Sequence, residues 1–517
     1  MNGFPWLTCL TLVPLLGGVG LVCGMAGRDR MARLVAWFVW GISAFLVLAL
    51  RTIVDLRAGT LQAVERYAWV PTLGVTYHVG VDGLGWVLLL LTVVVSGLAL
   101  LAGRTIRERV HVFHGLTLAL MATLFGTFTA LNFVHWFLFW ELSLIPAFFL
   151  VRLWGGPQRH TASIQFFLFT LAGSVAMLLG FLVVLLGTGE LDFPELARLA
   201  REGALWPAVW KHWNGWVQSP QGLALVVMVL VLAGLAVKIP MMPLHTWLPS
   251  TYSEAATPVT MLLTGAMSKM GVYGLVRIIL PVFQEPLRQA WPWLMGLALW
   301  TVVAAACAAL AQRDLKRMLA YSSVNHLGYC LLAVFALGAA GSGDQGAVHQ
   351  GAALNGLVLQ MFNHGLTAAT LFWCVGLLEE RSGGLRGLDD FGGLRAAAPV
   401  FCGLTGVAAF ASLGLPGLNG FVGEFLIFRG VFALVPWGAV LAAPGLLVTA
   451  VFLLRMLQRV FHGPVQPVCG SWCDLTGRER LALALPVAGM FVLGLWPQVL
   501  LQFTQPWAIQ LLGFLGV

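Results

Sequence analysis

Two lysines, Lys238 and Lys269, lie inside long apolar stretches of this 517-residue chain, which contains only four lysines in all. Glu141 and Glu424 lie in similar apolar surroundings. A charged side chain at the centre of a bilayer costs roughly 2.5–3.5 kcal/mol on insertion scales, so four such residues in one chain require a functional reason. Ionisable residues inside membrane helices typically mark ion pathways and proton relays. These four residues therefore predict a path for protons or ions.

Two histidines extend this set of residues. Counted along their apolar stretches, Glu141, Lys269, His326 and His364 all fall toward the middle of a hydrocarbon core about 30 Å thick. The predicted proton carriers, which would form a row in the membrane plane, are Glu141, Lys238, Lys269, His326, His364 and Glu424, with His245 and Glu254 as secondary candidates. The structural alternative is that such side chains only form hydrogen bonds to a neighbouring helix.

The composition indicates an integral membrane protein that would hold these residues on helices. Hydrophobic residues make up 59% of the chain, charged residues make up 10%, and the mean hydropathy is +0.88. The first 25 residues lack the basic region and cleavage site of a signal peptide, so we interpret them as the first membrane helix. Apolar runs predict an all-α polytopic protein with about fourteen spans, at 4–25, 32–54, 82–103, 110–131, 133–153, 161–188, 222–249, 258–281, 290–312, 317–340, 351–379, 396–436, 438–462 and 481–503.

Basic residues predict how the chain is oriented. One alternating set of connections contains 18 Lys and Arg residues, and the other set contains 8. The richer set is therefore predicted to be cytoplasmic, and both termini are predicted to lie on the opposite side. The same bias accounts for the formal net charge of +8 without any need for nucleic-acid binding.

Two of the predicted spans should be broken near their middle. The seventh contains Pro240 and Pro243, and the twelfth contains Pro416 and Gly417. Proline removes a backbone donor, and unwound backbone at membrane depth is tolerated where it is buried in protein or lines a cavity. Two breaks five helices apart predict an inverted repeat of spans 4–8 and 9–13. Within a single membrane domain, 1–517, the predicted parts are 1–109 (three N-terminal helices), 110–281 (first repeat), 290–462 (second repeat) and 463–517 (C-terminal loop and helix).

The sequence has no feature that predicts a bound cofactor. A glycine-rich phosphate loop and a dinucleotide fingerprint are both absent. Cys469 and Cys473 form a C-x3-C pair with no further clustered ligands, which is weak evidence for a metal site. We therefore predict no metal and no cofactor on this chain, so that any redox chemistry takes place elsewhere.

Several motifs resemble the antiporter-like subunits of respiratory complex I, in unbroken order from about residue 80 to 465. They are FLFWELSLIPAFFLVRLWGG, AVKIPMMPLHTWLP, LTGAMSKMGVYGLVR, QRDLKRMLAYSSVNHLGY, QMFNHGLTAATLFW and LGLPGLNGFVGEF. Glu424 in GEF resembles the M-type subunit and its counterpart in the photosynthetic relatives, whereas the L-type and N-type subunits typically carry lysine there. One departure concerns Ser250 and Tyr252, which stand where the family usually has an acid and a histidine at a cytoplasmic helix end.

The resemblance implies a proton-translocating subunit of an NADH:quinone oxidoreductase that is not catalytic alone. It implies a Glu141–Lys238 input ion pair, a central carrier at Lys269, a histidine relay, and Glu424 as the last carrier. NAD(P)H or ferredoxin, FMN, iron–sulfur clusters and quinone are expected in partner subunits. L-type and N-type subunits and lipids are expected as neighbours. The expected location is the bacterial inner membrane, or the thylakoid membrane in a photosynthetic relative. The alternatives are an Mrp-type cation/proton antiporter subunit and a membrane subunit of an inorganic-carbon-uptake or hydrogenase complex.

Overall fold

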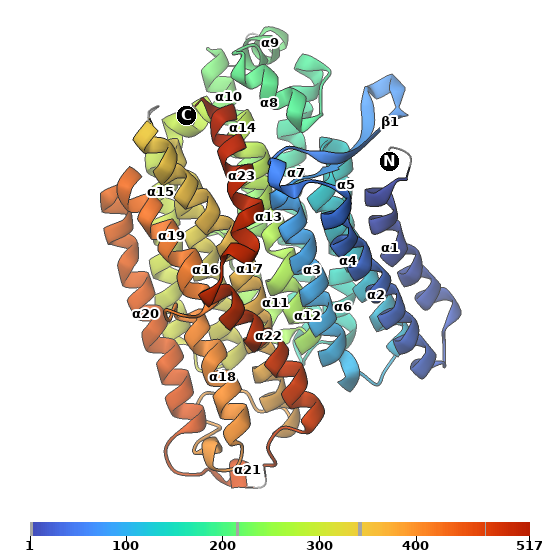
Figure 1. Cartoon of the computed structure of the whole chain (residues 1–517), viewed down its shortest axis with the longest axis vertical. Coiled ribbons are helices and arrows are strands. Elements are labelled where there is room, and N and C mark those ends of the chain that lie inside the picture. Colours follow the sequence, from blue (N-terminus) through green and yellow to red (C-terminus); the bar gives the residue numbers. More distant parts are fainter. Residues whose placement is uncertain (1–3, 214–216, 340–343, 471, 517) are drawn as a thin grey trace.

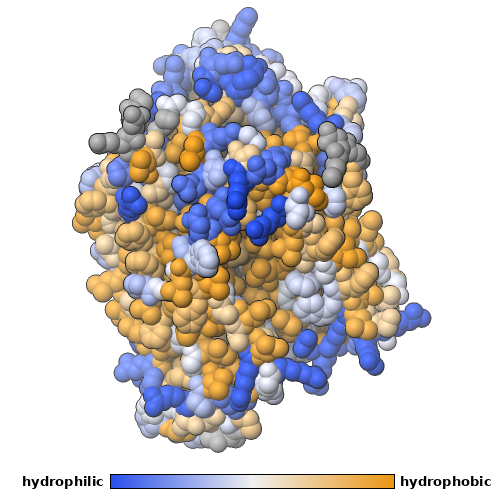
Figure 2. All heavy atoms as spheres, viewed as in Figure 1, coloured by the Kyte–Doolittle hydropathy of each residue, from blue (hydrophilic) through white to orange (hydrophobic). Residues whose placement is uncertain are grey.

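A computed structural model describes residues 4–213, 217–339, 344–470 and 472–516. Long helices run roughly side by side between two ends of the molecule, and α1 begins at the same end at which α23 finishes (Figure 1). Hydrophilic residues gather at both ends and a hydrophobic belt lies between them (Figure 2). This distribution is what a bilayer requires of a spanning protein, because lipid tails cannot solvate polar groups.

The helices of the first half are α1 (Trp6–Gly24), α2 (Asp29–Ile53), α3 (Gly83–Ala102), α4 (Val110–Thr129), α5 (Phe133–Leu142), α6 (Leu144–Trp154), α7 (Arg159–Thr188), α8 (Phe193–Arg201), α9 (Leu205–His212), α10 (Pro220–Lys238), α11 (Trp247–Glu254), α12 (Thr257–Leu262), α13 (Lys269–Gly274) and α14 (Leu280–Val282). Those of the second half are α15 (Gln284–Ala311), α16 (Leu315–Gly338), α17 (Asp344–Arg381), α18 (Pro399–Ser412), α19 (Asn419–Leu434), α20 (Pro436–Phe461), α21 (Pro467–Gly470), α22 (Gly477–Leu495) and α23 (Gln498–Leu515).

The remaining elements are short. Two are π-helical turns, η4 (Leu263–Met267) and η5 (Leu275–Ile279), which join α12, α13 and α14 into one continuous span. Four are 3₁₀ turns: η1 (Leu56–Ala58), η2 (Pro71–Leu73), η3 (Gly103–Thr105) and η6 (Leu394–Ala396). The strands β1 (Gln62–Val70) and β2 (Val75–Val81) pair antiparallel with Arg66 opposite His78.

The described part of the chain has 12 spans that are long and apolar enough to cross a membrane, or 13 if the bent pair α22 and α23 forms one span. The predicted number was about fourteen. One difference lies in the predicted span 396–436, which is two shorter helices, α18 and α19, because the chain unwinds between them. In the lower count, the predicted span 481–503 is also missing, because the chain bends by 58° between α22 and α23. The predicted end of the tenth span, residue 340, lies outside the described residues. The predicted inverted repeat stays a prediction.

Helices differ in how much of their surface they bury. Nearly all of the apolar window is buried in three spans: Thr257–Val282, Leu315–Gly338 and Gly346–Arg381. On α2, by contrast, Phe38 and Phe45 are 70% and 68% exposed. The first group therefore forms the centre of the bundle, whereas α2 presents an apolar face to lipid or to a neighbouring protein.

The β-hairpin lies in the connection between the predicted spans 32–54 and 82–103. One buried carboxylate binds it to the helix bundle. Asp192, just before α8, accepts from Arg66 (2.7 Å), Thr76 (2.9 Å) and Asn132 (2.6 Å), and its Oδ2 lies 3.1 Å from His78 Nδ1. Burial alone would raise the pKa of Asp192, but the hydrogen bonds from His78, Asn132 and Thr76 outweigh it and lower the pKa below its ordinary value.

Acidification should therefore release the hairpin from the bundle. Because the pKa of Asp192 is lower in the folded state, its stabilising contribution is complete above the unfolded-state pKa of about 3.9 and is lost as the pH falls through the folded-state pKa. Amide hydrogen exchange in β2 should accelerate over that range. Asp192→Asn should weaken the hairpin at neutral pH and abolish the pH dependence. Glu195→Gln, a change of a half-buried carboxylate on α8 that pairs with Arg198 and not with the hairpin, should preserve it. An unchanged exchange profile in Asp192→Asn would contradict this assignment.

Candidate functional site

The central feature of the site is a lysine that directly follows a widened helical turn. In η4, the backbone N–H of Ser268 donates to the carbonyl of Leu263, five residues earlier, at 3.0 Å. Lys269 comes next and is fully buried. Its ammonium group donates to the carbonyl of Thr264 at 2.6 Å and lies 2.7 Å from His364 Nδ1. Single π-helical turns are frequent at functional sites, and this one presents a carbonyl acceptor to the lysine.

From Lys269 the contacts continue across three further helices, first by a ring contact between two histidines and then by hydrogen-bonding contacts. The rings of His364 on α17 and His326 on α16 are 5.4 Å apart between centroids. His326 Nδ1 lies 3.1 Å from Glu424 Oε1 on α19, and its Nε2 lies 3.2 Å from the hydroxyl of Ser412. Lys269, His364, His326 and Glu424 are each at most 6% exposed. The structure thus brings four of the six predicted carriers into one chain of contacts.

Three of these residues also lie near the middle of their spans. Lys269 is the thirteenth of 26 residues in Thr257–Val282, His326 is the twelfth of 24 in Leu315–Gly338, and His364 is the nineteenth of 36 in Gly346–Arg381. Because these spans run between the same two ends of the molecule, their midpoints lie at similar depth. We name the four residues Lys269, His364, His326 and Glu424 the central row.

The break in the predicted twelfth span positions the last member of the central row. Helix α18 ends at Ser412 and α19 begins at Asn419, so Pro416 and Gly417 lie in the unwound segment, as predicted. Gly414 has φ +78°, and a Cβ added there would come within 2.6 Å of Glu424 Oε2. Glycine at this position therefore leaves room for the carboxylate beside the unwound backbone.

An amide pair that sequence reasoning missed holds this break against α17. Asn363 donates to the carbonyl of Asn419 at 2.6 Å, and Asn419 donates back to the carbonyl of Asn363 at 3.3 Å. Asn363 directly precedes His364, so the pair fixes a relay histidine relative to the break. The available sequence signals were the asparagines in QMFNHG and PGLNG, because a buried asparagine requires hydrogen-bond partners.

The predicted seventh span is also broken where expected. Helix α10 ends at Lys238, and the segment up to α11 contains Pro240 and Pro243. Lys238 is 2% exposed, donates to the hydroxyl of Ser143 at 3.2 Å, and lies 4.9 Å from the centroid of the Trp140 ring. This cation–π contact supplies part of the stabilisation that a buried ammonium group needs.

The structure does not bring Glu141 and Lys238 into direct contact, and their predicted ion pair stays a prediction. No ion pair joins the two residues within the described part of the chain, and Glu141 Oε1 is buried without a hydrogen-bond partner. Lys238 instead contacts Ser143 and Trp140, which flank Glu141 in the sequence. Ser143 also interrupts the helix between α5 and α6. The two charges remain close enough to interact electrostatically.

The secondary candidates lie in two different places. His245 lies in the α10–α11 break, with its ring 5.9 Å from that of Tyr321 and its Nδ1 buried without a partner. Glu254, at the end of α11, lies instead in an ion-pair network that is separate from the central row. Its carboxylate accepts from Arg386 at 3.0 Å and from the backbone N–H of Gln158 at 2.8 Å.

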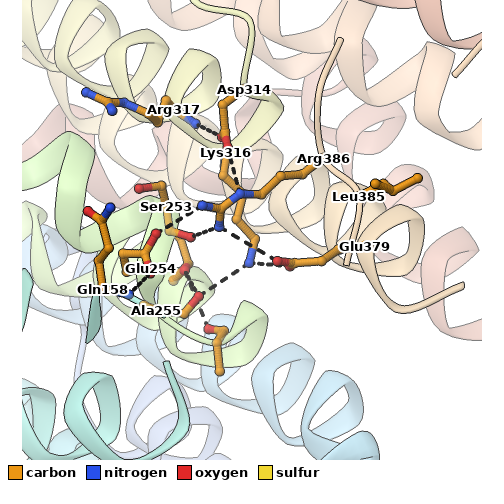
Figure 3. A network of polar contacts seen from close by, with 12 residues as sticks. Gln158, Ser253, Glu254, Ala255, Asp314, Lys316, Arg317, Glu379, Leu385 and Arg386 are labelled. Atoms are coloured by element: carbon orange, nitrogen blue, oxygen red, sulfur yellow. Dashed lines mark hydrogen bonds and ion pairs between the residues drawn. The ribbon is translucent and has the colours of Figure 1, made fainter. Parts of the chain in front are cut away.

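Arg386 is the hub of this network (Figure 3). Besides Glu254, its guanidinium group contacts Asp314 at 2.6 Å and Glu379 at 3.7 Å, and Lys316 contacts Glu379 at 2.5 Å. The network joins the ends of α11, α16 and α17, which come from both halves of the chain. Sequence reasoning could not find it, because its members are far apart along the chain.

Replacing Arg386 by alanine should destabilise the protein by about 2 kcal/mol, since charge-assisted hydrogen bonds contribute roughly 1.5–3 kcal/mol and three carboxylates would lose their shared partner. The midpoint of thermal unfolding in detergent should fall. Arg395→Ala removes an exposed arginine from the same connection and should leave the midpoint unchanged. Equal midpoints for the two variants would show that the network contributes nothing to stability.

The described residues contain no group of three or more histidine, cysteine or acidic side chains placed to hold a metal ion. Cys469 is buried and Cys473 is exposed, and both are free thiols. The site as described is therefore built from proton-exchanging side chains and unwound backbone.

Comparisons with known proteins place this geometry in context. The family described as NADH:quinone oxidoreductase/Mrp antiporter, TM, matches residues 130–452. NAD(P)H-quinone oxidoreductase chain 4 1 of Synechococcus sp. (strain JA-3-3Ab) is 37% identical over 96% of this chain and 91% of its own. NAD(P)H-quinone oxidoreductase chain 4 of Gloeobacter violaceus (strain ATCC 29082 / PCC 7421) is 34% identical over 99% and 93%.

Two solved structures have a similar fold. A chain of respiratory complex I from Thermus thermophilus with bound NADH aligns with a TM-score of 0.82 and 28% identity, covering 99% of this chain and 100% of that chain. A chain of the Mrp complex from Dietzia sp. DQ12-45-1b aligns with a TM-score of 0.83 and 20% identity, covering 99% of this chain and 100% of that chain. The second likeness shows the fold alone.

Proposed function

Because this chain belongs to the NADH:quinone oxidoreductase/Mrp antiporter family, we propose that it is an M-type subunit that moves protons across the membrane in a complex I-like quinone oxidoreductase. The observation that carries the proposal is the central row: a buried lysine, two histidines and a glutamate in successive contact. Each of these side chains can gain and lose a proton, and none has bulk water as its partner.

The geometry supports a stepwise transfer along the central row. A proton on the Lys269 ammonium group passes to His364 Nδ1, with which it already shares a 2.7 Å contact. Transfer between the two histidine rings and then from His326 Nδ1 brings the proton to Glu424. All four side chains are at most 6% exposed, so an extra charge on the row would not be solvated by bulk water. This condition favours movement of the proton over its storage.

Glu141 and Lys238 serve as the input side of the path in this proposal. Lys238 is held by Ser143 and Trp140 at the break, and Glu141 interacts with it electrostatically without a direct contact. A rearrangement that brings the two charges together or apart changes how strongly Lys238 holds its proton. Lifting one proton against 150 mV requires about 3.5 kcal/mol, and breaking a buried ion pair is worth about 3–5 kcal/mol, so the magnitude is sufficient.

The redox chemistry takes place in other subunits under this proposal. NAD(P)H or ferredoxin would be oxidised, and quinone reduced, by partner subunits that carry FMN and iron–sulfur clusters. The chain would then lie in a bacterial plasma membrane or a thylakoid membrane, next to L-type and N-type neighbours. The cyanobacterial relatives named as NAD(P)H-quinone oxidoreductase chains support this assignment over the antiporter alternative.

Inverted membrane vesicles distinguish redox-driven pumping from cation/proton antiport. In sodium-free buffer, addition of the electron donor and quinone should acidify the vesicle interior if the chain works within a quinone oxidoreductase. A cation/proton antiporter would instead change a preformed pH gradient when sodium is added without any electron donor. Acidification that strictly requires sodium, or that proceeds equally without quinone, would overturn the proposal.

A further inference from the structure

A cavity of about 1000 Å³ lies outside the site described above, where four helices meet at the end predicted to be cytoplasmic. The first turns of α2, α4 and α22 and the last turn of α3 form its walls. These ends lie together at the lower end of the molecule (Figure 1). The apolar part of its lining consists of Leu34, Trp37, Leu100, Leu101, Leu481 and Leu485.

Four arginines, Arg30, Arg33, Arg104 and Arg478, also line this cavity, with Asp29 as the single carboxylate. None of the four guanidinium groups takes part in an ion pair within the described residues. Arg33 donates one hydrogen bond, to the carbonyl of Ile106 at 2.7 Å, and its Nε is buried without a partner. The cavity therefore combines an apolar wall with an excess of positive charge, four arginines against one aspartate, and this combination suits an anionic amphiphile.

A second and independent observation lies deeper in the cavity. His114 lines it, is 1% exposed, and has no hydrogen-bond partner at either ring nitrogen among the described residues. An imidazole ring always carries at least one N–H donor, and a buried donor without an acceptor costs roughly 1–3 kcal/mol. Together with Arg33 Nε, His114 thus requires oxygen acceptors inside the cavity.

We propose that this cavity binds one anionic glycerophospholipid of the leaflet that faces Arg30, Arg104 and Arg478. The phosphate lies among these exposed arginines, as expected for basic pockets between membrane helices. Phosphate and ester oxygens supply the acceptors that His114 and Arg33 lack. The acyl chains follow the leucine wall and leave along the exposed apolar face of α2, where Phe38 lies. A soluble phosphate would leave the apolar wall uncovered, and for this reason the lipid is the occupant favoured here.

Photo-crosslinking tests this proposal on the purified intact complex. The probe is phosphatidylglycerol with a diazirine on one acyl chain, and the matched zwitterionic probe is phosphatidylcholine with the same chain. Mass spectrometry should find phosphatidylglycerol attached to peptides that contain Leu34–Trp37 or Leu481–Leu485, about tenfold more than phosphatidylcholine. Inorganic phosphate should fail to compete, because it cannot occupy the apolar wall.

Charge reversal supplies the matched variants. Arg104→Glu/Arg478→Glu changes two exposed arginines of the cavity and should lower phosphatidylglycerol attachment about tenfold. Arg313→Glu/Arg395→Glu changes two exposed arginines elsewhere at the predicted cytoplasmic side and should not lower it. Three results would overturn the proposal. They are equal attachment of both lipids to the parent complex, displacement of the lipid by phosphate, and occupation of the cavity by a neighbouring subunit in place of lipid. The comparison of lipids on the parent decides the question even if the charge-reversed variant fails to assemble.

Discussion

Replacing Lys269 by alanine should lower proton pumping in inverted membrane vesicles at least about tenfold, with quinone reduction falling in parallel and the complex still assembled. Lys269 is the only amine in the central row, and its removal leaves His364 Nδ1 without the contact at 2.7 Å. Lys269→Arg sharpens the test, because arginine keeps the positive charge but does not release its proton at any pH relevant to proteins. A carrier role predicts that both variants lose pumping.

Lys211→Ala provides the control for this prediction, since Lys211 is an exposed lysine on α9. Pumping by this variant should match the parent. If Lys269→Arg pumps normally while Lys269→Ala does not, the residue supplies a charge for structure and does not carry protons. Normal pumping by both variants would remove Lys269 from the mechanism altogether.

Glu424→Gln should also lower pumping at least about tenfold, with little change in stability. Glutamine has the shape of the glutamate and can still accept a hydrogen bond from His326, but it cannot take up a proton. The unwound segment and the space left by Gly414 should tolerate it. Proton pumping and quinone reduction in vesicles, together with the amount of assembled complex, are the measurements.

Glu380→Gln is the matched control for this substitution, because Glu380 is an exposed glutamate at the end of α17. It should pump as the parent does. Loss of pumping in Glu424→Gln accompanied by loss of assembly would show a structural role for the carboxylate. Retained pumping would show that Glu424 is not a proton carrier and that the proposed path stops at His326.

Much of the fold could be predicted from the sequence, because membrane helices need long apolar runs and breaks need proline or glycine. Both breaks lie where Pro240, Pro243, Pro416 and Gly417 placed them. The β-hairpin was missed because a two-stranded ribbon gives only a weak periodic signal over Gln62–Val81. The two π-helical turns were also missed, since an extra residue in a turn has no sequence signature of its own.

The membership of the site was easier to predict than its contacts. Charged residues within apolar spans are costly, so Lys269 and Glu424 stood out, and the order of contacts through His364 and His326 agrees with the implied relay. Whether Glu141 and Lys238 are in direct contact could not be predicted, because the contact depends on which helix face each side chain occupies. Arg386 could not be predicted as a hub, because only the tertiary fold brings its three carboxylates together.

The similar depth of Lys269, His364 and His326 has an electrical consequence. A transmembrane potential falls along the membrane normal, so a row that lies across that direction follows an equipotential surface. Proton steps from Lys269 to His326 then do almost no work against the field. Work against the potential is done where protons move along the membrane normal, from one surface to the row and from the row to the other surface. Membrane voltage should therefore slow the vertical segments and leave the horizontal relay unaffected.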